Sequence, residues 1–138
     1  MIARVILLIN LFVLVIGCKE DPPQPILRFN EGKGVLAIGQ TGLFFTPNDS
    51  IPIKIKLERV VSDSRCPEGA NCIWAGLISA EIIVDDKNNF TTPSSVPQNN
   101  PLIYKNKIIK IIGATPYPKV NSTINQRDYK LEFSVDSI

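Results

Sequence analysis

Two stretches in which apolar and polar residues alternate strictly constrain the fold of this chain more than any other feature. In residues 51–58, isoleucine and leucine alternate with proline, lysine and glutamate, and in residues 129–136 aromatic and aliphatic residues alternate with charged residues and serine. Successive side chains of a β-strand point to opposite faces, so each stretch predicts a strand with one face against a core. No stretch shows a sustained 3.6-residue period with capping residues, so the folded part is predicted to lack helices.

Shorter runs rich in branched aliphatic or aromatic residues predict further strands, and turn-forming residues separate them. Together they make about seven short strands, which suits one domain. The predicted fold is all-β: a single antiparallel β-sandwich, immunoglobulin-like or jelly-roll-like, with a partly open β-barrel as the alternative. The additional strands are expected at residues 35–38, 41–45, 77–84, 102–104 and 107–114.

Residues 1–17 have the organisation of a signal peptide. Arg4 lies in a short basic segment, an apolar run interrupted only by Asn10 follows at 5–16, and Gly17 supplies a small residue before a cleavage point. The apolar run is about a dozen residues long, whereas a helix that crosses a bilayer needs roughly 20. Export followed by cleavage is therefore predicted in preference to a permanent transmembrane anchor.

The residues Val-Ile-Gly-Cys that end at Cys18 resemble the lipobox of bacterial lipoproteins. In that motif the cysteine receives a diacylglyceryl group and becomes the new N-terminus, and fatty acyl chains such as palmitate hold the protein in the membrane. Each buried CH₂ of an acyl chain adds about 0.8 kcal/mol, so several chains together anchor a protein durably. The resemblance implies lipidation of Cys18 and attachment to the membrane through this anchor.

A charged, proline-rich segment follows Cys18 and predicts a flexible stalk over residues 18–32, because its prolines disfavour both helix and sheet interior. The β domain is expected at residues 33–138. The acidic pair Glu20 and Asp21 resembles the export tag that some Gram-negative surface lipoproteins carry behind the cysteine. The expected location is the cell envelope, with the outer membrane favoured and the leaflet left open.

The two remaining cysteines predict a disulfide. Three cysteines leave one unpaired in an exported protein, and lipidation of Cys18 accounts for it. Cys66 and Cys72 enclose Pro67 and Gly69, which permit a tight loop, and an oxidising compartment favours the bond. A zinc site generally needs four ligands, and the chain has no histidine. A redox pair usually has the spacing Cys-x-x-Cys, so a structural disulfide is preferred.

The stretch Asp-Ser-Arg-Cys-Pro-Glu-Gly-Ala-Asn-Cys-Ile-Trp-Ala-Gly at residues 63–76 resembles the hallmark of a group of small bacterial lipoproteins and secreted β domains. Thr-Pro-Tyr-Pro-Lys at 115–119, followed by Asp-Tyr at 128–129, matches the same group. The resemblance spans roughly residues 34–135. It implies a β domain in which the cysteine loop joins two strands, and it brings no activity with it.

Asp63, Arg65 and Trp74 flank the cysteine pair and admit two interpretations. In the first they form a structural brace, in which Trp74 covers the disulfide inside the core and Asp63 pairs with Arg65. In the second, Trp74, Arg65 and the loop form an exposed recognition patch, because tryptophan and arginine are enriched in the hot spots of protein interfaces. A fully buried Trp74 would remove the second interpretation.

No catalytic residue, metal ligand or cofactor site is predicted. The lack of histidine excludes a Ser-His-Asp or Cys-His arrangement, and no Walker A or dinucleotide motif occurs. Paired carboxylates could still hydrolyse glycosides, with Glu58 and Glu81 or Asp85 and Asp86 as candidates, although acids on strands and turns are usually solvated. Asp85, Asp86 and the asparagines at 88–89 could also hold calcium, but a hairpin turn is the preferred interpretation.

The charge balance argues against binding to nucleic acid. With Arg4 set aside, 14 of the 15 basic residues face 13 acidic ones, and the lysines alternate with apolar residues instead of clustering. The expected function is that of a non-catalytic, monomeric envelope lipoprotein whose tethered β domain binds a protein or glycan partner. The alternative is a secreted inhibitor of a hydrolase, with residues 65–74 or 93–101 as the inhibitory loop, and a carboxylate-dependent hydrolase is the third and least favoured function.

Overall fold

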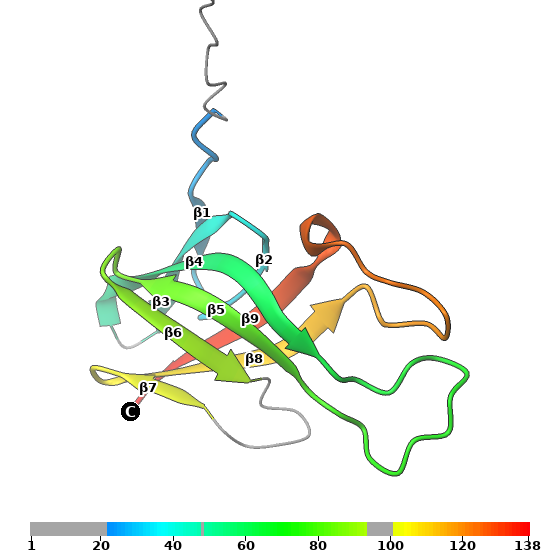
Figure 1. Ribbon diagram of the computed structural model, residues 1–138. Helices are drawn as coiled ribbons and strands as arrows, with labels where there is room; N and C mark the ends of the chain where they lie inside the picture. The colour runs from blue at the N-terminus through cyan, green and yellow to red at the C-terminus, as the bar shows by residue number, and fades with distance from the viewer. Residues whose placement is uncertain (1–21, 48, 94–100) are drawn as a thin grey trace, which may run out of the picture.

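The computed structural model describes residues 22–47, 49–93 and 101–138, which form nine β-strands and the short 3₁₀ turn η2 (Figure 1). The prediction of an all-β sandwich is confirmed, because the strands make two sheets that are not closed into a barrel. Within these ranges no helix is long and apolar enough to cross a membrane. The elements are β1 (Leu27–Phe29), β2 (Lys33–Ala37), β3 (Thr41–Thr46), β4 (Asp49–Asp63), β5 (Ile78–Val84), β6 (Asn88–Pro93), β7 (Leu102–Tyr104), β8 (Lys107–Thr115), η2 (Gln126–Asp128) and β9 (Lys130–Ser137).

The two sheets have different strand orders. The five-stranded sheet runs β1-β3-β4-β5-β6 and the four-stranded sheet runs β2-β9-β8-β7. All pairings are antiparallel except that of β1 with β3, which is parallel. The longest strand, β4, has 15 residues and runs from Asp49 to Asp63. Its final residues carry the chain to the end of the sandwich where the candidate site lies.

The core lies between the sheets and is made by alternate residues of each strand, as the sequence pattern predicts. Fully burying an aliphatic or phenylalanine side chain contributes roughly 1.5–3 kcal/mol, so this layer is the main source of stability. The buried hydrophobic residues of β4, β5 and β9 are Ile53, Ile55, Leu57, Val60, Ile78, Ala80, Ile82, Val84, Leu131, Phe133 and Val135.

Two positions depart from the predicted alternation. Ile51 is expected inside but is mostly exposed, because β4 begins at a turn in which Asp49 Oδ1 accepts a hydrogen bond from the Ile51 backbone N–H at 2.9 Å. Ser134 is expected outside but is buried, although Lys130 and Glu132 on the same face of β9 are exposed. Its hydroxyl lies 3.3 Å from Asp136 Oδ2 and donates a hydrogen bond to it.

Two strands lie where the sequence indicates a stalk and a turn. β1 falls within residues 18–32, and the sheet therefore begins at Leu27, ahead of the expected domain start at 33. The ring of Phe29 packs on Phe44 with centroids 4.8 Å apart and fills the space that a side chain at Gly34 would need. β6 completes a hairpin with β5, whose turn contains Asp85 at a φ of 50°.

Two loops meet at one end of the sandwich. Residues 64–77, between β4 and β5, form the loop drawn in green at the right of Figure 1, and residues 116–125, after β8, form the orange loop above it. A parallel bridge between Glu68 and Lys119 joins them, and the Glu68 N–H donates to the Pro118 carbonyl at 2.9 Å. We call them the cysteine loop (64–77) and the proline loop (116–125).

Candidate recognition site

The cysteine loop is closed at its base and cross-linked near its middle. Backbone N–H groups of Ser64 and Cys66 donate to the carbonyls of Leu77 and Ala75, each at 2.9 Å, and so continue the pairing of β4 with β5. The predicted disulfide between Cys66 and Cys72 is confirmed. The loop is therefore a short ladder that ends in a covalent ring.

Gly76 is required by the geometry of this base. Its φ is +70°, in the left-handed region that favours glycine, and a Cβ there would overlap the carbonyl group of Ser64. Gly69 also has a positive φ, at +86°, but a Cβ there would meet only Val120, at 4.0 Å. The close approach of the two sides of the loop thus depends on the missing side chain at position 76.

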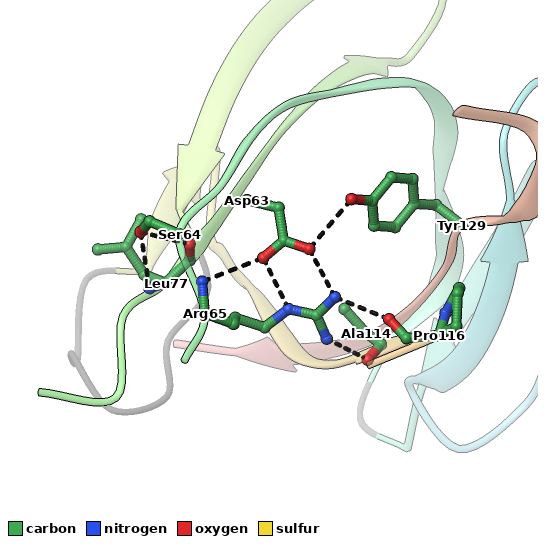
Figure 2. A network of polar contacts seen from close by, with 7 residues as sticks. All are labelled: Asp63, Ser64, Arg65, Leu77, Ala114, Pro116 and Tyr129. Carbon is green, nitrogen blue, oxygen red and sulfur yellow. Dashed lines mark hydrogen bonds and ion pairs between the residues drawn. The ribbon is translucent and has the colours of Figure 1, made fainter. Parts of the chain in front are cut away.

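Arg65 ties both sheets together beneath the loop (Figure 2). Its Nε and Nη2 donate to the two carboxylate oxygens of Asp63 at 2.9 and 2.7 Å. Nη1 donates to the carbonyl of Ala114 at 2.6 Å, and Nη2 donates also to that of Pro116 at 2.8 Å. The hydroxyl of Tyr129 donates to Asp63 Oδ2 at 3.0 Å. We call these five residues the Arg65 brace.

The brace is well shielded from water and fixes the charge of its members. The side chains of Asp63 and Arg65 are each 10% exposed. Burial raises the pKa of Asp63, but hydrogen bonds from the Arg65 side chain and backbone outweigh it, so the pKa of this carboxyl lies below its usual value. Burial, together with the hydrogen bond to Asp63, raises the pKa of Tyr129 to about 12. Asp63 is thus ionised and Tyr129 protonated at neutral pH, as the hydrogen bonds require.

The proline loop is held at both ends. At its start, the Arg65 guanidinium lies over the ring of Tyr117, 5.0 Å from the centroid. At its end, the amide of Gln126 makes two hydrogen bonds to the backbone of Val60, accepting from its N–H at 3.0 Å and donating to its carbonyl at 2.7 Å. Arg65 of the cysteine loop and Val60 of β4 therefore position the two ends of this loop.

Asp63 and Arg65 agree with the first interpretation of the cysteine loop, the structural brace, and Trp74 does not. Asp63 and Arg65 form the predicted structural pair, whereas Trp74 is 55% exposed and lies outside the core, so the interpretation in which it covers the disulfide there is wrong. Its neighbour Ile73 is fully exposed, at 106%, and Tyr117 and Val120 of the proline loop are nearly half exposed. We call Ile73, Trp74, Tyr117 and Val120 the apolar tip.

Sequence reasoning identified Trp74 but not the other three members of the apolar tip as site residues. Ile73 and Val120 belong to no alternating pattern, so their exposure depends on how the loops are folded. One signal was present in the sequence: residues 69–77 contain no charged side chain in a chain that is 20% charged. Loops usually carry charged and polar residues, so an uncharged loop at a domain end suggests a surface that is covered by something.

The carboxylates on β4 and β5 that could have formed a catalytic pair are engaged in ion pairs instead. Glu58 Oε2 lies 2.8 Å from Lys56 Nζ, and Glu81 Oε2 lies 2.6 Å from Arg59 Nε. A general acid for glycoside hydrolysis must be free to protonate the leaving group, whereas each of these carboxylates is occupied by a neighbouring cation.

The acidic turn after β5 is a hairpin turn, as preferred from the sequence. Asp85 and Asp86 have φ values of 50° and 60°, and they pair with Lys105 and Lys54, respectively, at 2.8 Å. Asp85 Oδ1 also accepts from the Lys54 backbone N–H at 3.2 Å. In the ranges that the structure describes, no three potential metal-ligating side chains come together.

A buried lysine at the other end of β4 was not identified from the sequence. Lys107 Nζ donates to Thr46 Oγ1 at 2.9 Å, Asp49 Oδ2 at 2.7 Å and Ser137 Oγ at 3.0 Å. The three acceptors match the three donors of a lysine side chain, and they hold Lys107 against residues of β3, β4 and β9. Lys107 occupies an inward position of its strand, which is the sequence signal for this buried charge.

Comparisons with protein-family models, with curated proteins and with solved structures gave no match. The signal peptide at 1–17, Cys18 with the start of the stalk, and most of the alternative inhibitory loop at 93–101 lie outside the described residues.

Proposed function

We propose that this chain is a non-catalytic envelope lipoprotein whose tethered β-sandwich recognises a protein or glycan partner through the apolar tip. The observation that carries the proposal is the exposure of four large apolar side chains on two adjoining loops at one end of the domain. Single exposed apolar residues are ordinary on protein surfaces, whereas a group that includes tryptophan and tyrosine is typical of an interaction site.

The rigidity of the site supports a role in recognition. The disulfide crosses the cysteine loop, the Arg65 brace fixes its base, and Gln126 fixes the far end of the proline loop. Ordering a flexible loop costs free energy at the moment of binding, and a loop that is already ordered avoids that cost. The tip is thus preorganised for contact with a partner.

The proposed attachment to the envelope membrane rests on Cys18 and the segments around it. The test is the intact mass of the protein from a membrane fraction, before and after reduction. A diacylglyceryl group and an added acyl chain on a chain that begins at Cys18 are expected, with a gain of two hydrogens on reduction of Cys66–Cys72. An unmodified chain that retains residues 1–17 would refute the lipoprotein part of the proposal.

Site-specific photocrosslinking in native membranes tests the recognition part. Trp74 is replaced by the photoreactive residue p-benzoyl-phenylalanine, and the same replacement at Ile103 on β7 is the matched control, because Ile103 is 62% exposed and lies on the opposite sheet. A discrete adduct is expected from position 74 and not from position 103. Equal labelling at both positions, or none at position 74, would contradict a recognition role for the tip.

A second candidate function is inhibition of a hydrolase, and the projecting shape of the cysteine loop favours it (Figure 1). A rigid loop that stands away from its domain can occupy the cleft of an enzyme. The purified protein is assayed against a panel of proteases and lysozymes at micromolar concentration. Dose-dependent inhibition that is lost in Ile73→Asp would favour this function, and the absence of inhibition across the panel would exclude those enzymes as partners.

A further inference from the structure

The disulfide closes a small ring at the outer end of the backbone ladder in the cysteine loop. The bond joins Cys66 to Cys72. Inside the ring, the Ala70 N–H donates a hydrogen bond to the Pro67 carbonyl at 3.0 Å and closes a turn. We call residues 66–72 the disulfide ring. Its conformation depends on one covalent bond and on one turn hydrogen bond.

The contacts that join this ring to the proline loop come from residues inside it. The Glu68 N–H donates to the Pro118 carbonyl at 2.9 Å, and Glu68 forms the parallel bridge with Lys119. Gly69 lies next to Val120, since a Cβ at position 69 would be 4.0 Å from Val120 Cγ2. The pairing of the two loops beyond their base therefore depends on how the ring is held.

The contacts that fix the base of the loops lie outside the ring. The Ser64 N–H donates to the Leu77 carbonyl, and Arg65 donates to the carbonyls of Ala114 and Pro116. None of these hydrogen bonds involves an atom of residues 66–72. A disulfide that closes so small a ring contributes only a minor part of the stability of a domain. Opening the ring should therefore leave the sandwich and the Arg65 brace intact.

The two cysteines differ in their access to solvent. Cys72 is exposed, whereas Cys66 is partly buried. Exposed disulfides are the ones that exchange with thiols, whereas a disulfide in a core is shielded from attack. The spacing Cys-x-x-Cys is typical of cysteines that catalyse exchange in a partner, but a disulfide that is itself reduced needs only one accessible sulfur. Cys72 provides such a sulfur.

We infer that the Cys66–Cys72 bond is a reversible redox switch, which a dithiol reductant opens to release the disulfide ring from the proline loop. The Arg65 brace continues to hold the base of both loops in the reduced state. The switch rests on the proposed function for its biological role, because it regulates the pairing of the two loops that carry the recognition site.

The reaction is a two-electron thiol–disulfide exchange. A thiolate of the reductant attacks Cys72 Sγ, the bond to Cys66 breaks, and Cys66 leaves as a thiolate that takes a proton from water. The second thiolate of the reductant then attacks the mixed disulfide and releases Cys72, which is protonated in turn. The reductant leaves as its own disulfide, and a disulfide oxidant reverses both steps.

Single-residue amide hydrogen exchange tests the inference. The full-length protein, isolated from membranes and held in nanodiscs, is compared before and after treatment with millimolar dithiothreitol under native conditions. The Glu68 amide reports on the contact with the proline loop, and the Ser64 amide reports on the base. Exchange at Glu68 should become at least tenfold faster on reduction while Ser64 is unchanged, and reoxidation should restore protection at Glu68.

Replacement of both cysteines by serine gives the matched control. The Cys66→Ser, Cys72→Ser variant should show the fast exchange at Glu68 without reductant and should not respond to dithiothreitol. Circular dichroism should show that it keeps its β-sheet content. A variant that does not fold would contradict the inference, because the ring is then needed for the whole domain.

Three results with the unsubstituted protein would also overturn the inference. The first is a bond that stays intact in dithiothreitol, seen as no mass gain of two hydrogens. The second is equal acceleration at Glu68 and Ser64, which would mean that the base opens as well. The third is reduction with no acceleration at either amide. Since no partner takes part in the measurement, each of these results leaves the proposed function standing, and a failure of crosslinking from position 74 leaves the switch standing.

Discussion

Replacing Arg65 by alanine should destabilise the domain more than any other single change to a charged residue of the site. The substitution removes the guanidinium and leaves the buried Asp63 carboxylate without its cation, together with the carbonyls of Ala114 and Pro116 without their donor. Removing one partner of a buried ion pair costs about 3–5 kcal/mol. Because the pair retains 10% exposure, water can reach the cavity in part, and the lower end of that range is expected.

This loss is large compared with the stability of a small domain, which is typically about 5–15 kcal/mol. At roughly 4 °C per kcal/mol for a domain of this size, Arg65→Ala should lower the Tm by about 12 °C. Urea denaturation followed by far-ultraviolet circular dichroism measures the free energy of unfolding directly. Arg65→Lys should recover only part of the loss, because an ammonium group cannot reproduce the fork that Arg65 presents to Asp63 and the two carbonyls.

Arg59→Ala provides the matched control. Arg59 also pairs with a carboxylate, Glu81, at 2.6 Å, but its own side chain is mostly exposed. Exposed pairs of this kind contribute about 0.2–1 kcal/mol. If the free energies of unfolding of Arg65→Ala and Arg59→Ala differ by less than about 1 kcal/mol, the Arg65 brace contributes no more to stability than an exposed ion pair.

Three further outcomes follow from the same end of the sandwich. Reducing the Cys66–Cys72 bond, or replacing both cysteines by serine, should lower the free energy of unfolding by about 2 kcal/mol, the value that the loop-entropy model gives for a ring this small. Urea denaturation measures this difference, and no change would mean that the loop is held by its backbone hydrogen bonds alone. Tyr129 should titrate near pH 12, above its usual value of about 10, in an absorbance titration at 295 nm. Its raised pKa contributes stability that is complete below about pH 10 and is lost as the pH rises towards 12, and Tyr129→Phe should remove this dependence. Gly76→Ala should lower the free energy of unfolding by about 1 kcal/mol or more beyond the loss in Gly69→Ala, because both residues have a positive φ but only a Cβ at position 76 meets a carbonyl group. Equal melting temperatures of the two variants would contradict the close approach of the loop's two sides.

The strands were predictable where apolar and polar residues alternate regularly along the chain. In residues 51–58 of β4 and 130–136 of β9 the polar and apolar residues alternate, and the pattern predicts which side chains are buried at every position except Ile51 and Ser134. β1 was missed because three prolines precede it and because its largest residue, Phe29, packs against Phe44 and the bare backbone of Gly34. That partnership joins two parts of the chain that no local pattern connects.

The candidate site was predictable in its chemistry and not in its geometry. The spacing of Cys66 and Cys72 indicates the disulfide, and the neighbouring Asp63 and Arg65 indicate a pair. Whether Trp74 is buried or exposed could not be predicted, since an aromatic residue after a disulfide suits both a core and a surface. Burial there is decided by the proline loop, which packs against the base of the cysteine loop and leaves the apex uncovered.

The Arg65 brace makes presentation of the tip conditional on complete folding. Asp63 belongs to the five-stranded sheet, whereas Ala114 and Tyr129 belong to or adjoin the four-stranded sheet. The hydrogen bonds from Arg65 to Ala114 and from Tyr129 to Asp63 span 49 and 66 residues of sequence. They require both sheets to be formed and packed together. A chain that has formed only one sheet cannot hold its two loops together. The arrangement of the two loops thus distinguishes completely folded molecules from partly folded ones.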